Sequence, residues 1–247
     1  MTLQLWSNVR STALEMDTTK AVGTPTTADA PPGGRILLHG LTGNDQQYLT
    51  HLNMQLLADT FGTVIALPQG SRSFWINQAH GLAYGTWVGE ELPRLLRQTL
   101  RVSHRRADTI IGGLSMGGYG AFRAAFDYPQ NFGGAFSLSG TLDVSEAAFR
   151  GRHPDLYDVG FGDPDRPGTT NDLLQRLQDA PPDLPPLYLA CGSEDRLWDQ
   201  NQRFVATAIE TQTDFEWVPA AGAHNFQYWG RELPDAIAHF FTPLLTA

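Results

Sequence analysis

One serine of the chain lies among five glycines. Ser115 belongs to the stretch IIGGLSMGGYGA, residues 110–121, between an apolar run and a helical pattern. Glycine inside a helix or strand costs roughly 0.5–1 kcal/mol relative to alanine, so these glycines indicate a tight turn or a close approach of two backbones. Residues 113–117 match Gly-x-Ser-x-Gly between a strand and a helix, which is the setting of a nucleophile elbow. The alternative is an ordinary glycine-rich turn.

A serine hydroxyl needs partners before it can act as a nucleophile near neutral pH. A base must accept its proton, and a third group must orient that base. In this architecture an acid and then a histidine follow the serine along the chain, on loops at the carboxyl ends of later strands. Asp195, in LYLACGSEDRLW, and His224, in EWVPAAGAHNFQYW, have this placement. Glu194 and Asp199 are the alternative acids.

The other histidines fit the role of the base less well. His239 falls within the helical pattern DAIAHFF, and His51, His80, His104 and His153 all precede the acid in the chain. We expect these histidines to be structural or to lie on the surface.

The oxyanion of a tetrahedral intermediate needs hydrogen-bond donors. One is normally the N–H of the residue after the nucleophile, here Met116, and the other comes from the loop after an earlier strand. RILLHG is followed by LTGNDQQY, so the N–H of Leu41 is the candidate second donor. His39 could be another base, but we expect it to brace this loop by hydrogen bonding.

Short apolar runs alternate with helical patterns along most of the chain, which predicts an α/β fold with a largely parallel sheet. Two alternating segments at the start, 3–11 and 13–22, predict an antiparallel edge. The predicted strands that follow are 35–40, 63–69, 108–113, 134–140, 185–192 and 214–220. The predicted helices are 45–60, 89–100, 117–129, 201–212 and 232–245.

Residues 141–184 break this alternation. They hold several prolines, the run FGDPDRPGTT and one helical pattern, NDLLQRLQ (171–178). Because the region is too long for an ordinary connection, we expect a lid-like excursion over the sheet. A misread pair of helices is the alternative. The sequence has no evident linker, so residues 1–247 are expected to form a single domain.

Composition excludes several classes of partner. The 247 residues carry 17 basic and 26 acidic side chains, a net charge of −9, which argues against nucleic acid and anionic membranes. A signal-peptide pattern and an apolar run of about 18 residues are both absent from the sequence, so a cytoplasmic protein is expected. Cys191 is the single cysteine, which excludes an intrachain disulfide and a cysteine metal cluster. We expect neither metal nor cofactor.

Several segments, in order, resemble one group of enzymes: LLHGLTGNDQQYL, YGTWVGEELP, GLSMGGYGAFRAA, LYLACGSEDRLWDQN and GAHNFQYW. Together they run from residue 36 to 229 and resemble the α/β-hydrolase superfamily. Within it they are most similar to the group of tributyrin esterases and S-formylglutathione hydrolases (esterase D). The resemblance implies an α/β-hydrolase fold, a mostly parallel twisted sheet with helices on both faces. It also implies a serine esterase that uses Ser115, Asp195 and His224, with Leu41 and Met116 as oxyanion donors.

Two departures favour the acyl-esterase branch of the group. The glutathione branch usually carries a cysteine after HGLT and a histidine after SMGG, where this chain has Gly43 and Tyr119. The expected substrate is therefore an ester with a short acyl chain or an aryl acyl group such as feruloyl.

Aromatic side chains near the site are expected to line the substrate pocket, and the candidates are Trp75, Tyr157, Trp198 and Phe226. An S-formylglutathione thioesterase and an acyltransferase are alternatives that use the same site. A catalytically inactive binding module is an alternative from another class. A homo-oligomer is left open by the sequence.

Overall fold

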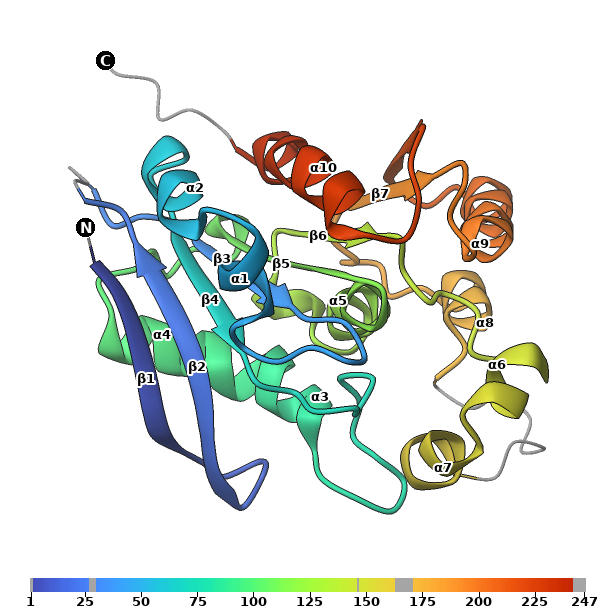
Figure 1. Cartoon of the computed structure of the whole chain (residues 1–247), viewed down its shortest axis with the longest axis horizontal. Coiled ribbons are helices and arrows are strands. Elements are labelled where there is room, and N and C mark those ends of the chain that lie inside the picture. The colour runs from blue at the N-terminus through green and yellow to red at the C-terminus, as the bar shows by residue number, and fades with distance from the viewer. Residues whose placement is uncertain (1, 27–29, 146, 163–170, 242–247) are drawn as a thin grey trace.

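The computed structural model describes residues 2–26, 30–145, 147–162 and 171–241 (Figure 1). An eight-stranded sheet runs through it in the order β1-β2-β4-β3-β5-β6-β7-β8. β1 and β2 pair with each other in the antiparallel sense, β2 pairs with β4 in the same sense, and the remaining neighbours are parallel. The strands are Thr2–Ser11 (β1), Met16–Thr24 (β2), Gly34–Leu38 (β3), Val64–Pro68 (β4), Thr109–Leu114 (β5), Gly134–Leu138 (β6), Leu187–Gly192 (β7) and Phe215–Ala220 (β8). The expected parallel sheet with an antiparallel N-terminal edge is confirmed.

The strand order places a functional crevice in the middle of the sheet. The chain passes from β3 outward to β4, and then returns past β3 to β5 and continues in the other direction. Loops that leave the carboxyl ends of β3 and β5 therefore diverge to opposite faces, and α/β sheets bind their ligands at such a point. All residues of β3 to β7 are buried, as continuous apolar strands between two layers of helices should be.

Helices cover both faces of the sheet, and each face has its own apolar core. Three helices cover one face: α1 (Gln47–His51), α2 (Met54–Thr60) and α10 (Phe226–His239). The helices of the other face include α4 (Leu92–Thr99), α5 (Met116–Asp127), α8 (Leu173–Gln178) and α9 (Trp198–Glu210). None of the helices described is long and apolar enough to span a bilayer.

Two predicted helices differ from the structure: one is interrupted, and the other starts earlier than predicted. The helix expected at 45–60 is broken into α1 and α2, because Leu52 is extended and Asn53 caps α2 by accepting the N–H of Leu56. The helix expected at 89–100 starts earlier, with α3 (Tyr84–Thr86) and a π-helical turn (Trp87–Glu91, η1) before α4. Pro93 follows that π-helical turn, where the regular α-helical pattern of backbone hydrogen bonds is already interrupted. The missing N–H of the proline is therefore accommodated.

The last predicted helix also begins too late. α10 starts at Phe226 rather than at 232, because the side chain of Asn225 accepts the N–H of Tyr228 and caps it. Residues 242–245 of the prediction lie outside the described residues.

The 141–184 segment is more helical than predicted. The pattern at 171–178 is confirmed as α8. α6 (Ala147–Arg152), α7 (Pro154–Leu156) and a π-helical turn (Tyr157–Phe161, η4) precede it, as the alternative of misread helices anticipated. Phe149 and Phe161 of this segment pack on Phe74, with ring centroids 5.1 and 5.4 Å away. Aromatic contacts therefore hold these helices against the loop after β4. Residues 163–170, which contain much of the proline-rich run, lie outside the described residues.

Candidate active site

Ser115 stands at a strained turn between β5 and α5. Its backbone has φ 55° and ψ −117°, a region that non-glycine residues seldom occupy. The residue is buried, with 8% of its surface exposed. The flanking glycines are required by close approach. A Cβ on Gly117 would lie 1.9 Å from the carbonyl oxygen of Leu38, and one on Gly113 would lie 2.5 Å from the carbonyl carbon of Gly117. The turn has the geometry of a nucleophile elbow, in which strand and helix pass too closely for side chains.

Three side chains far apart in the sequence meet at this turn. His224 Nε2 lies 3.0 Å from Ser115 Oγ, and His224 Nδ1 lies 2.9 and 3.0 Å from the two carboxylate oxygens of Asp195. A carboxylate only accepts hydrogen bonds, so Nδ1 carries the proton of the neutral ring and Nε2 is left free to accept the serine proton. The three groups form one directed chain of hydrogen bonds.

The loops that carry Asp195 and His224 are fastened to each other. The N–H of Ser193 donates to the carbonyl of Ala220 at 2.8 Å, and the N–H of Glu194 donates to that of Gly222 at 3.0 Å. The acid loop after β7 and the histidine loop after β8 therefore move as a unit, which preserves the distance between carboxylate and imidazole.

The alternative residues lie elsewhere. Glu194 is exposed and accepts a hydrogen bond from Ser193 Oγ, and Asp199 is exposed in the first turn of α9. His239 forms an ion pair with Glu216 at 2.9 Å near the end of α10. Among the described residues, the carboxylate partner of His224 is Asp195.

Ser139 and Trp229 complete the surroundings of Asp195. Burial by itself raises the pKa of the Asp195 carboxyl, but the hydrogen bond and charge of His224, the amide of Leu197 and the hydroxyl of Ser139 outweigh burial and hold that pKa below its ordinary value. Ser139 Oγ in turn accepts the indole N–H of Trp229 at 3.1 Å, and the Trp229 ring meets the His224 ring edge-on at 4.8 Å. Sequence reasoning assigned Ser139 no role, although its place directly after β6 at the carboxyl edge was a usable signal.

The loop after β3 brings two amides toward Ser115. A Cβ added to Gly40 would lie 3.7 Å from Ser115 Cβ, so this loop borders the elbow. The amide of Gly40 donates to Gln47 Oε1 at 3.1 Å. The next amide, that of Leu41, and the amide of Met116 have no acceptor among the residues that the structure describes. Two unpaired donors beside a nucleophile suit a developing oxyanion.

His39 braces the same loop, as expected from the sequence. Its Nδ1–H donates to the carbonyl of Gly40 at 2.8 Å, and its Nε2 accepts the amide of Gly70 at 3.1 Å. Burial lowers the pKa of His39, outweighing the hydrogen bonds that favour its charged form, so the ring is neutral and this tautomer follows.

The four aromatic pocket candidates have different surroundings. Trp75 is 1% exposed and donates its indole N–H to the carbonyl of His39, so it supports the loop from beneath rather than lining a pocket. Trp198 packs on Trp217 of β8, and Tyr157 stacks on Phe161. Phe226 is the candidate joined to the triad by aromatic contacts, because its ring meets that of Trp229 at 5.1 Å.

Comparisons with known proteins agree with this geometry. The Esterase family model matches residues 11–240. An acetyl esterase of Caldicellulosiruptor saccharolyticus is 29% identical over 212 residues, which cover 81% of this chain and 80% of the relative.

Two solved structures have the same fold. The fluorophosphonate-binding serine hydrolase F (FphF) of Staphylococcus aureus superposes with a TM-score of 0.85 at 23% identity, over 97% of this chain and 99% of that one. An S-formylglutathione hydrolase (FrmB) of the same organism superposes with a TM-score of 0.81 at 22% identity, over 98% and 99%. The chain thus belongs to the Esterase family and is a carboxylesterase-type serine hydrolase with the α/β-hydrolase fold.

Proposed function

We propose that this enzyme hydrolyses short-chain acyl esters through an acyl-enzyme intermediate on Ser115. The observation that carries the proposal is the directed chain of hydrogen bonds from Ser115 through His224 to Asp195, with distances of 3.0 and 2.9 Å. Nucleophile, base and orienting acid are each on a different loop of the carboxyl edge, as this chemistry requires.

In this proposal each step belongs to a named group. His224 Nε2 accepts the proton of Ser115 Oγ while that oxygen attacks the ester carbonyl, and the amides of Leu41 and Met116 bind the resulting oxyanion. Asp195 stabilises the imidazolium without taking its proton. The imidazolium then protonates the departing alkoxide, leaving an acyl-serine. A water molecule, deprotonated by His224, attacks the acyl carbonyl. The bond to Ser115 Oγ then breaks, His224 returns the proton to that oxygen, and the carboxylic acid is released.

Two observations support a short acyl group. The matched acetyl esterase is named for the shortest common acyl group. The aromatic rings between the 141–184 segment and the loop after β4 also pack against one another, which leaves little room among them. Tyr119 belongs to this cluster: it is fully buried and donates its hydroxyl to the carbonyl of Asn171 at 2.7 Å. The position at which the glutathione branch usually carries histidine is therefore occupied here by a core residue.

A panel of esters tests the proposal. Turnover of p-nitrophenyl esters from acetate to octanoate is compared with that of methyl ferulate and S-formylglutathione. We expect the highest kcat/KM for the shortest acyl chains. Ser115→Ala is expected to lower kcat by about 10⁴–10⁶-fold, because removing the nucleophile disables the whole triad. Ser193→Ala is the matched control, since Ser193 is an exposed serine on the acid loop.

Specific results would contradict each part. Activity retained by folded Ser115→Ala would refute the mechanism. Faster turnover of S-formylglutathione than of every oxygen ester would identify a thioesterase instead of an esterase for short acyl esters. Adding an alcohol acceptor distinguishes the acyltransferase alternative: an ester product that forms faster than free acid would identify a transferase.

A further inference from the structure

Three arginines reach the catalytic edge of the sheet from strands on both sides of Ser115. Arg72 follows β4, Arg152 ends α6 in the segment after β6, and Arg196 directly follows Asp195 after β7. β5, which carries Ser115 at its end, lies between β4 and these later strands in the sheet order. Because parallel strands direct their carboxyl ends to one edge, the segments that carry the three arginines leave the sheet at the same edge as the elbow.

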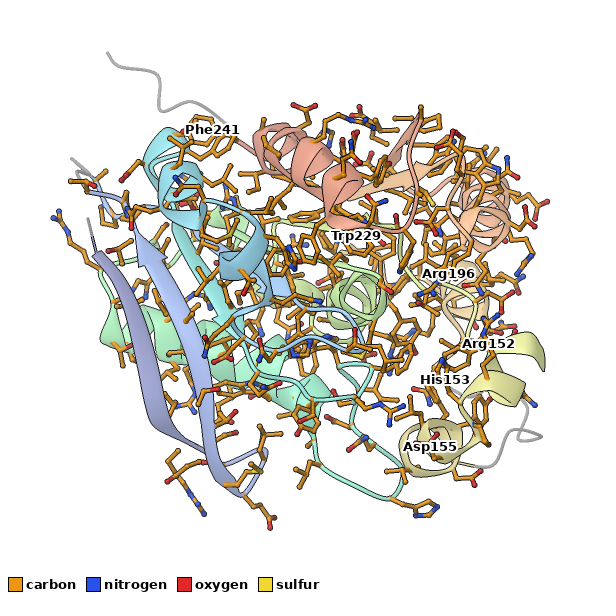
Figure 2. All side chains as sticks on the ribbon, in the orientation of Figure 1. Arg152, His153, Asp155, Arg196, Trp229 and Phe241 are labelled. Atoms are coloured by element: carbon orange, nitrogen blue, oxygen red, sulfur yellow. The ribbon has the colours of Figure 1, made fainter. Side chains whose placement is uncertain are left out.

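The electrostatic surroundings of His153 show that the three arginines are near one another. The pKa of His153 is lowered, first by burial, then by the charges of Arg72, Arg152 and Arg196, while Asp155 opposes them. Exposed charges separated by much more than about 10 Å are largely screened at ordinary ionic strength, so the three arginines and Asp155 are near enough to the imidazole to act on it. Figure 2 shows Arg152, His153 and Asp155 along α6 and α7, with Arg196 drawn between them and Trp229.

The charges in this cluster do not cancel. Arg72 is paired with Asp155 at 3.3 Å. Arg152 and Arg196 are exposed and form no ion pair with any residue in the part of the chain that the structure describes. Three cations and one carboxylate thus act on a neutral imidazole, in a chain whose net charge is −9. Adjacent guanidinium groups repel each other, and an anion placed between them would relieve that repulsion.

A series of ring contacts connects the cluster to the oxyanion loop. The His153 ring lies 5.8 Å from that of Phe149, which lies 5.1 Å from that of Phe74. Phe74 directly precedes Trp75, whose indole N–H donates to the carbonyl of His39. His153, which directly follows Arg152, is therefore joined to the aromatic layer that supports the site.

We propose that Arg152 and Arg196, with Arg72 beside them, bind a carboxylate carried by the ester substrate, so that the enzyme prefers acidic esters to neutral ones. The inference rests on the proposed esterase function and adds its substrate class. Guanidinium groups suit this task because their planar donors match a carboxylate in bidentate geometry and keep their charge at all physiological pH values.

Matched pairs of esters test the preference. One pair is 3-acetoxybenzoate and its methyl ester, with the carboxylate on the alcohol side. The other is phenyl hydrogen adipate and methyl phenyl adipate, with the carboxylate on the acyl side. In at least one pair, we expect the acidic ester to have a kcat/KM about three- to tenfold above that of its neutral partner, through a lower KM. The preference is expected to disappear between about 20 mM and about 500 mM NaCl, since salt screens exposed charges.

The double variant Arg152→Gln/Arg196→Gln is expected to reduce the ratio of acidic to neutral kcat/KM to about one. Arg101→Gln/Arg105→Gln is the control, because it removes the same charge from the loop before β5, at the opposite edge of the sheet. An unchanged ratio in the first variant, or an equal fall in both variants, would overturn the arginine site.

The test separates this inference from the proposed function. If the wild type hydrolyses neither neutral ester, the proposed function fails, and equilibrium dialysis of 3-acetoxybenzoate and phenyl hydrogen adipate with Ser115→Ala still decides the arginine site. The two proteins compared are Ser115→Ala and Ser115→Ala/Arg152→Gln/Arg196→Gln. Equal binding of both acids to these proteins would overturn the arginine site, and weaker binding of either acid to the second protein would support it.

Discussion

Replacing Ser139 with alanine should weaken both folding and catalysis, because one buried hydroxyl serves two partners. Its oxygen accepts the indole N–H of Trp229 at 3.1 Å, and the hydroxyl also favours the charged form of the Asp195 carboxyl. Trp229 is only 6% exposed, so its N–H would be left without a partner, at a cost of about 1–3 kcal/mol in the free energy of unfolding. We expect urea unfolding at neutral pH to show a loss of this size.

The catalytic effect comes from the second partner. The hydroxyl of Ser139 is one of the groups that lower the pKa of Asp195, so Ser139→Ala is expected to raise that pKa and to weaken the stabilisation of the His224 imidazolium. We therefore expect kcat to fall, by about tenfold for every 1.4 kcal/mol of imidazolium stabilisation that is lost. Because a less stabilised imidazolium loses its proton more readily, the acid limb of the kcat–pH profile should move to lower pH in the variant.

The pH dependence of stability has a definite sign. The folded-state pKa of Asp195 is lowered, so its contribution is fully present above the unfolded value of about 3.9 and is lost as pH falls through the folded value. Ser139→Ala makes that contribution smaller. The part of the stability difference that comes from Asp195 should therefore be largest at neutral pH and shrink below about pH 4.

Trp229→Phe is the matched control. It keeps an aromatic ring beside His224 but removes the indole N–H, so kcat should stay within about threefold of wild type. The double variant Ser139→Ala/Trp229→Phe should be more stable than Ser139→Ala alone, because no buried N–H is then left unpaired. A double variant no more stable than Ser139→Ala, or a Ser139→Ala enzyme with the wild-type pH profile, would refute the reasoning.

Three further substitutions test the site and its frame. Asp195→Asn is expected to lower kcat by about 10³–10⁴-fold, since an amide does not hold the imidazole in the required tautomer; steady-state kinetics measures this. Gly117→Ala should cost more than about 3 kcal/mol by urea unfolding, because its Cβ would lie 1.9 Å from Leu38 O, whereas Gly34→Ala, with open space around its Cβ, should cost under about 1 kcal/mol. His39→Ala should reduce kcat about 10–100-fold with KM little changed. Its pH profile should keep the wild-type shape, because His39 is already neutral.

Strands were easier to predict from the sequence than helix ends. Strands such as Thr109–Leu114 are covered on both faces, so each is a short, fully apolar run that needs no distant information. Helix breaks depend on whether a side chain rather than a backbone carbonyl accepts a backbone N–H, which the apolar periodicity does not show. The side chain of Asn53 accepts a backbone N–H and divides one apolar pattern into α1 and α2.

The surroundings of Asp195 could be predicted from the sequence only in part. Its place after a strand and before a histidine loop was visible in the chain order. For Ser139 only its place directly after β6 was visible, because its contacts depend on a backbone with φ 51° and on an indole from α10, ninety residues away. The burial of Trp75 was likewise invisible, since nothing in SRSFWIN distinguishes a supporting ring from a pocket wall.

The sequence by itself determined which residue types were available and at which strand ends they would stand: a serine in a glycine turn, then an acid, then a histidine. That information is local, because chain order and glycine content act through the backbone of a few neighbouring residues. Only the tertiary structure decided that Asp195 rather than Glu194 faces His224, that His39 is a neutral brace, and that Arg152 and Arg196 have no carboxylate partner among the residues it describes. Each of these three features depends on how close segments remote in the chain lie and on how deeply they are buried. Distance and burial in turn set the hydrogen bonds and the pKa values.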